Sequence, residues 1–60
     1  MNDKEIYLQA LKNNRGKTDE ITLGEELGLD EDSTQKIISQ LLSEHKISFE
    51  PFGLCNYKTT

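Results

Sequence analysis

Residues 21–47 read ITLGEELGLDEDSTQKIISQLLSEHKI, and this stretch contains two helical patterns separated by a glycine. Its start, Thr22-Leu23-Gly24-Glu25, has the spacing of a capping box, in which a hydroxyl and a carboxylate satisfy the free amides of a helix start. The pattern predicts a short helix over Leu23–Leu27, which ends at Gly28.

The second pattern predicts a longer helix over Glu31–Glu44, capped by Asp30. At about 100° per residue, its apolar side chains fall on one face, with Leu41 expected at the centre of the core. The opposite face is polar and consists of Asp32, Lys36, Ser39, Gln40 and Ser43. One buried and one solvated face is typical of a helix on the surface of a small globular domain.

The flanking residues extend this pattern to the whole chain. A first helix is predicted over about Asp3–Asn14, with an apolar stripe formed by Ile6, Tyr7, Ala10 and Leu11. A polar connector follows. After the long helix, apolar and polar residues alternate over Ile47–Glu50, which predicts a strand. Pro51-Phe52-Gly53 is typical of a turn, and Leu54–Lys58 is the predicted returning strand. The fold class is therefore α+β: one domain over residues 1–60, with three helices and a C-terminal β-hairpin.

The order Ile-Thr-Leu, Leu-Gly-Leu-Asp, Ser-Thr and His-Lys-Ile within residues 21–47 resembles the winged helix-turn-helix family of bacterial regulators. The resemblance implies that Leu23–Leu27 is the supporting helix, Glu31–Glu44 the recognition helix and Phe49–Leu54 the wing. It also implies a brief first strand near Ile21. It implies a DNA-associated transcriptional regulatory module, in which the recognition helix enters the major groove and the wing touches phosphate.

The sequence departs from the pattern of that family in three ways. Glu26 stands where the supporting helix usually has a small residue, and His45 stands where the recognition helix usually ends in glycine. His45 must therefore either adopt the left-handed conformation itself, with a positive φ, or end the helix differently. The basic residues that are common along a recognition helix are nearly absent.

Length and composition restrict the function classes. Sixty residues provide one core and no enclosed catalytic cavity, so the chain is not expected to be an enzyme. His45 and Cys55 lack the third, orienting group of a nucleophilic site, and one His with one Cys cannot supply four zinc ligands. No metal or cofactor is expected. The lone Cys and the lack of a secretory signal or long apolar run predict a cytoplasmic protein without a membrane segment.

The charge distribution argues against the DNA binding that the resemblance implies. The net charge is −4, and the stretch from Asp19 to Asp32 has no basic residue but seven acidic ones: Asp19, Glu20, Glu25, Glu26, Asp30, Glu31 and Asp32. Carboxylates near phosphate oppose binding, because affinity for DNA comes largely from neutralised phosphates. If duplex DNA is a partner, it is expected to bind a homodimer through Ser33, Gln35, Lys36, Ser39, Gln40 and Lys58.

The alternative is an acidic protein–protein interaction module of the same fold that does not bind DNA directly. A basic partner protein is then expected to contact Glu25, Glu26, Asp30 and Glu31. Phe52 on the hairpin is either a further contact for that partner or folds back on Tyr57 or Leu8. A smaller basic group, Lys12, Arg15, Lys17 and Lys58, forms either one patch or scattered surface charge.

Overall fold

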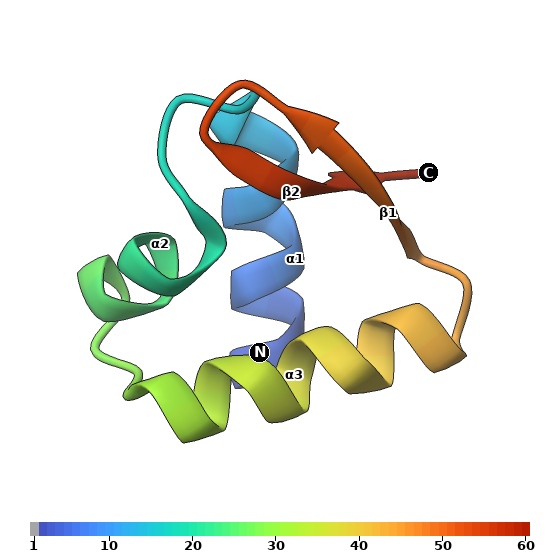
Figure 1. Ribbon diagram of the computed structural model, residues 1–60. Coiled ribbons are helices and arrows are strands. Elements are labelled where there is room, and N and C mark those ends of the chain that lie inside the picture. Colours follow the sequence, from blue (N-terminus) through green and yellow to red (C-terminus); the bar gives the residue numbers. More distant parts are fainter. Residues whose placement is uncertain (1) are drawn as a thin grey trace.

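The computed structural model describes residues 2–60, apart from the side chain of Phe52. Three helices, α1 (Asp3–Asn14), α2 (Glu20–Glu26) and α3 (Glu31–Ser43), precede a hairpin of β1 (Ile47–Phe52) and β2 (Cys55–Thr59). Figure 1 shows α1 standing nearly upright on α3, with the hairpin at the far end of α1. This α+β arrangement has the winged-helix layout that the sequence predicts.

Helix α2 begins three residues earlier than its capping-box pattern indicates. The Asp19 carboxylate accepts hydrogen bonds from the backbone amides of Ile21 at 3.1 Å and Thr22 at 3.0 Å, so Asp19 is the N-cap. The predicted span Leu23–Leu27 was wrong because Asp19 satisfies these amides upstream of Thr22. Since Ile21 lies inside the helix, it forms no strand, and the sheet of the described residues has two strands.

The core is formed by one face of each helix and the inner side of the hairpin. Its members are Tyr7, Leu11, Leu23, Ile37, Ile38, Leu41, Ile47 and Cys55. Leu41 has no exposed surface, which confirms its predicted central position. The predicted stripe on α1 was partly wrong: Ile6 is 38% exposed, whereas Tyr7 is fully buried and its hydroxyl donates to the Glu20 carbonyl at 2.8 Å.

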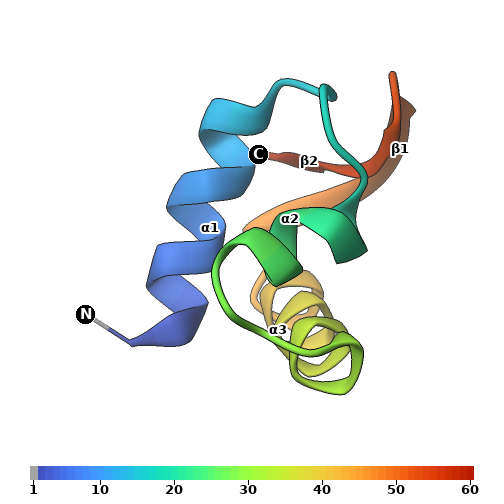
Figure 2. The same cartoon turned by 90° about the vertical axis from the view of Figure 1, so that its left-hand side faces the viewer.

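Helices α2 and α3 approach most closely where Gly24 meets Thr34 (Figure 2 shows α2 above α3). A Cβ added to Gly24 would lie 2.1 Å from Oγ1 of Thr34, which is fully buried and donates to the Asp30 carbonyl at 2.8 Å. Gly24 is thus the small residue of the supporting helix. The position inferred for it from the resemblance, Glu26, is exposed and makes no such contact.

The end of α3 follows the first alternative for His45, whose φ is +59°. The His45 amide donates to the Leu42 carbonyl and the Lys46 amide to the Leu41 carbonyl, at 3.1 and 3.0 Å. These are the two hydrogen bonds of a Schellman motif, with His45 in the position usually held by glycine. They turn the chain so that Ile47 enters the core at the start of β1.

The hairpin folds back on the body of the domain and does not project from it. Its turn lies at Gly53-Leu54, later than the predicted Pro51-Phe52-Gly53, and the pairing is irregular between Phe49 and Phe52. The Leu54 amide donates to the Gly16 carbonyl at 2.9 Å. Gly53 has a φ of +63°, and a Cβ there would lie 2.5 Å from the same carbonyl oxygen. The tip of the wing is therefore tied to the connector between α1 and α2.

The Gly24–Thr34 contact predicts a coupled pair of substitutions. Gly24→Ala is expected to destabilise the domain by about 1–3 kcal/mol, because overpacking outweighs the better helix propensity of alanine. Thr34→Ala removes the two nearest atoms, so Gly24→Ala in that background is expected to cost about 0.5–3 kcal/mol less. Urea denaturation of the four proteins measures this coupling. Equal costs of Gly24→Ala in both backgrounds would show that the helices do not meet here.

Candidate interaction surfaces

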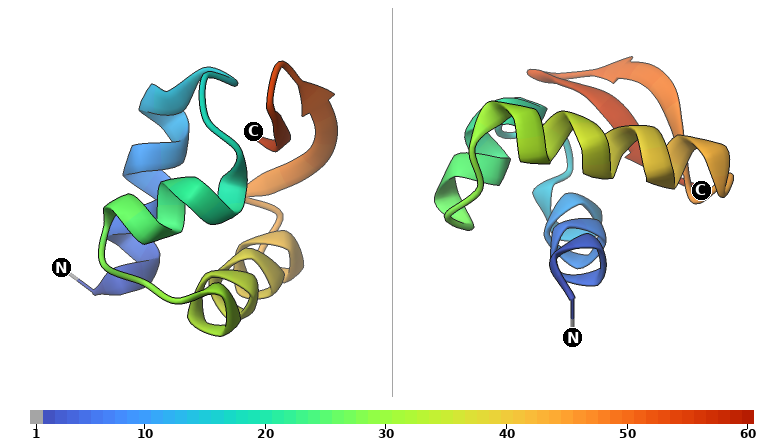
Figure 3. Two further views of the ribbon diagram at one scale, coloured as in Figure 1. Left: turned by 60° about the vertical axis from the view of Figure 1, so that its left-hand side comes forward. Right: turned by 90° about the horizontal axis from the view of Figure 1, so that it is seen from below.

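The outer face of α3 carries most of the predicted DNA-contact residues. Gln35, Lys36, Ser39 and Gln40 are exposed and line one shallow hollow together with Asp32. They can donate and accept hydrogen bonds, but Lys36 is the one cation that lines this hollow, and it lies beside an acid. Lys58, predicted with this set, lies on β2 and lines a different groove. Figure 3 (right) shows the length of α3 from below, with the hairpin behind it.

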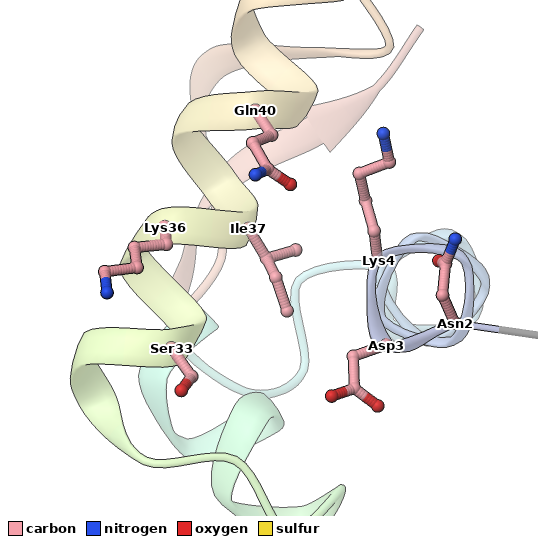
Figure 4. Close-up of a pocket in the computed structure, with 7 residues that line it drawn as sticks. All are labelled: Asn2, Asp3, Lys4, Ser33, Lys36, Ile37 and Gln40. Carbon is pink, nitrogen blue, oxygen red and sulfur yellow. The ribbon is translucent and has the colours of Figure 1, made fainter.

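A second hollow, about 460 Å³ in volume, separates the start of α1 from α3 (Figure 4). In Figure 4, Ile37 lies between the two helices and Lys36 points away from α1. Ser33 and Gln40 face this hollow with Asp3 and Lys4. The Lys4 ammonium already pairs with Glu44 at 2.6 Å. The hollow is thus a polar surface with mixed charge, without a set of groups that would select one ligand.

The acidic stretch between α1 and α3 is divided between structural and free carboxylates. Asp19 and Asp30 are helix caps, the latter accepting the Ser33 amide at 2.7 Å. Glu20 accepts hydrogen bonds from the backbone and side chain of Asn56, both at 3.2 Å, and so joins α2 to β2. Sequence reasoning did not find this link, because the two residues lie 36 positions apart.

Four exposed carboxylates remain at the α2–α3 end of the molecule, and no ion pair is present for any of them within the described residues. We call this set the acidic ridge; it consists of Glu25, Glu26, Glu31 and Asp32. The end of α2 and the beginning of α3, which carry these residues, lie on the side of Figure 1 opposite the C-terminus. Three of the predicted protein-interface residues belong to the ridge, namely Glu25, Glu26 and Glu31, whereas Asp30 is a helix cap.

Three of the four residues in the predicted basic group meet at the other side of the domain. Lys12 and Arg15, at the end of α1, line a groove of about 230 Å³ with Lys58 of β2. We call this the basic groove; its other lining residues are Leu11, Gly16, Tyr57 and Thr59. The structure thus favours one patch over scattered charge for these three residues, whereas Lys17 does not line the groove.

Among the described residues, the two most exposed large apolar side chains lie on the hairpin. Phe49 is 63% exposed and Leu54 is 69% exposed. Phe49 meets Tyr57 edge to face, with ring centroids 5.6 Å apart. The predicted contact residue Phe52 has its side chain outside the described residues.

The groups that could perform chemistry are separated. Cys55 is 1% exposed, and burial raises the pKa of its thiol, whereas His45 lies on an exposed turn. Burial also raises the pKa of the Tyr7 hydroxyl. Within residues 2–60, no group of three or more His, Cys, Asp or Glu side chains is placed to hold a metal ion.

The helix caps also set the pH response of the domain. Hydrogen bonds from Thr22 to Asp19, and from the backbone and side chain of Ser33 to Asp30, lower the pKa of both carboxyls. Hydrogen bonds from Lys4 and then Lys46 lower the pKa of Glu44. A carboxyl whose pKa is lower in the folded state stabilises the fold above its unfolded pKa, and this contribution is lost as the pH falls.

No protein-family model, curated protein sequence or solved structure matches the chain. None of the helices in the described part of the chain has the length and apolar character needed to cross a membrane. The surfaces described above are therefore the observations on which a function can be proposed.

The cap at Asp30 predicts an acid-dependent stability. The melting temperature is expected to fall as the pH is lowered from about 5 to about 2, and Asp30→Asn is expected to make this fall shallower. Asparagine keeps the oxygen that accepts the Ser33 amide but lacks the charge, so at neutral pH it loses only the part of the stability that acid removes from Asp30. Asp30→Ala also flattens the acid response, and it lowers the melting temperature at neutral pH further because the acceptor oxygen is lost as well. Circular dichroism melts across pH measure both; an unchanged acid response in both variants would contradict this role.

Proposed function

We propose that the chain is a winged-helix regulatory module that acts through a protein contact of its acidic ridge, and that its association with DNA is through that partner. The observation that carries the proposal is the exposed ridge of Glu25, Glu26, Glu31 and Asp32, which has no ion pair within the described residues. A basic protein surface complements such a face and is steered toward it.

The ridge occupies the end of the helix-turn-helix that would approach DNA phosphate. In the DNA-binding members of the family it resembles, the recognition helix enters the major groove by its N-terminal residues. Here those residues include Glu31 and Asp32, and the preceding helix ends in Glu25 and Glu26. Each carboxylate in that position repels the phosphates of the DNA backbone. The same placement that disfavours DNA binding therefore favours binding of a basic protein.

The wing supports the same conclusion. A wing that touches phosphate projects from the domain with donors at its tip. In this chain the tip folds onto Gly16 through the Leu54 amide, and the described tip residues include exposed Leu54 and Glu50 but no cation.

A pull-down from lysate of the source cells, with and without nuclease, tests the protein contact. The wild-type chain is expected to retain a basic protein after nuclease treatment. Glu25→Lys/Glu26→Lys is expected to lose it, whereas the matched variant Asp3→Lys/Glu5→Lys, which changes the charge equally on α1, retains it. If nuclease treatment abolishes capture by the wild-type chain, or if both variants lose capture equally, the acidic ridge is not the binding surface.

A regulator that recognises DNA directly is the second candidate, favoured by the polar outer face of α3 with Gln35, Lys36 and Gln40. The charge argument instead predicts that the isolated chain binds random duplex DNA more weakly than about 10⁻⁴ M at physiological salt, with a shallow salt dependence. Fluorescence anisotropy across a salt series measures this. Micromolar affinity that Lys36→Glu abolishes would establish DNA recognition by α3 in place of the proposed function.

A further inference from the structure

The basic groove is a second charged surface, on the other side of the molecule from the acidic ridge. Its cations come from two elements, α1 and β2, and no carboxylate is among its lining residues. Within residues 2–60, Lys12, Arg15 and Lys58 take part in no ion pair. We propose that the basic groove binds an extended acidic segment of a partner protein, which pairs with β2 as a third strand.

The free side of β2 faces the groove. Figures 1 and 2 both place β2 between β1 and α1, and the described sheet has only these two strands. Three consecutive residues, Tyr57 to Thr59, line the groove together with Gly16. The strand edge is therefore part of the groove wall.

The register identifies which backbone groups are available there. The Thr60 amide donates to the Lys46 carbonyl, and Ser48 lies opposite Lys58. Because hydrogen-bonded pairs alternate along an antiparallel ladder, the backbone groups of Tyr57 and Thr59 point away from β1. The Tyr57 carbonyl already accepts a hydrogen bond from the Cys55 thiol at 3.3 Å. The groups offered at this edge are therefore the Tyr57 amide and the amide and carbonyl of Thr59. An extended peptide laid along this edge can pair with them, as in other complexes formed by strand addition.

The charges define the chemistry of that segment. Side chains of an added strand alternate between the two faces of the sheet, so acidic residues at alternate positions can meet Lys58 on one side of the groove or Lys12 and Arg15 on the other. The Arg15 guanidinium can bind a carboxylate through two parallel hydrogen bonds.

A polypeptide fits this surface better than a nucleic acid does. Three cations neutralise few phosphates, and the net charge of −4 repels a long polyanion. The strand edge offers main-chain pairing that only another polypeptide can match in register. The partner segment therefore has acidic side chains and an extended backbone that can pair with β2.

Titration of the ¹⁵N-labelled chain with a peptide of alternating glutamate and valine tests the proposal by two-dimensional NMR. Chemical-shift changes are expected at the end of α1, at Gly16 and along Tyr57–Thr59. They are expected to be absent from the acidic ridge, so this result is independent of the contact proposed for the ridge.

Two charge reversals separate a local site from net charge. Lys58→Glu is expected to weaken peptide binding by roughly three- to ten-fold. The matched variant Lys36→Glu, an equal charge change on the outer face of α3, is expected to leave the affinity unchanged. Both lysines are exposed, and the spectra themselves report whether each variant is folded.

Four outcomes would overturn the proposal. The first is that Lys58→Glu and Lys36→Glu weaken peptide binding equally, and the second is that a lysine–valine peptide binds as tightly as the acidic one. The third is that an oligothymidylate of the same charge binds the groove residues more tightly than the peptide does. The fourth is that the acidic peptide causes no chemical-shift changes. The third outcome would assign the groove to nucleic acid.

Discussion

The burial of one face of α3 is the constraint on which the rest of the domain depends. Leu41 has no exposed surface, and α1, α2 and β1 all pack against this helix. In a chain of 60 residues no other element offers a comparable apolar face, so α1 and the hairpin gain their stability by covering it. Once Thr34, Ile37 and Leu41 face inward, helical geometry turns Lys36 and Gln40 outward. The residues of that outer face are not constrained by packing of the core.

The features that the sequence predicted correctly are those with local causes. The 3.6-residue period sets the buried face of α3. The positive φ of His45 was anticipated from the resemblance, which places a helix-ending glycine at this position, and its cause is the local Schellman turn. The alternation of Ile47–Glu50 likewise identified a strand from neighbouring residues alone.

The features that sequence reasoning missed depend on contacts between distant residues. The start of α2 is the exception, because it was missed although its cause is local: Asp19, and not Thr22, accepts the first amides of the helix. Neither Ile6 nor Tyr7 could be placed inward from the pattern of α1, because both are apolar and adjacent. Tyr7 can be buried because its hydroxyl donates a hydrogen bond to the Glu20 carbonyl. A buried hydroxyl without such a partner would destabilise the fold. The basic groove, too, exists only after β2 has been laid beside α1.

Helix capping explains the positions of only some of the acidic residues in this chain. Asp19 and Asp30 each occupy an N-cap, where an acceptor is needed and any of several residue types would serve. Glu25 and Glu26 lie instead at the C-terminal end of α2, where the helix dipole disfavours negative charge. Local stability therefore does not account for these two residues, and their exposure leaves them available to a partner. Their placement, more than the total of acidic residues, is what favours the protein contact proposed for the acidic ridge.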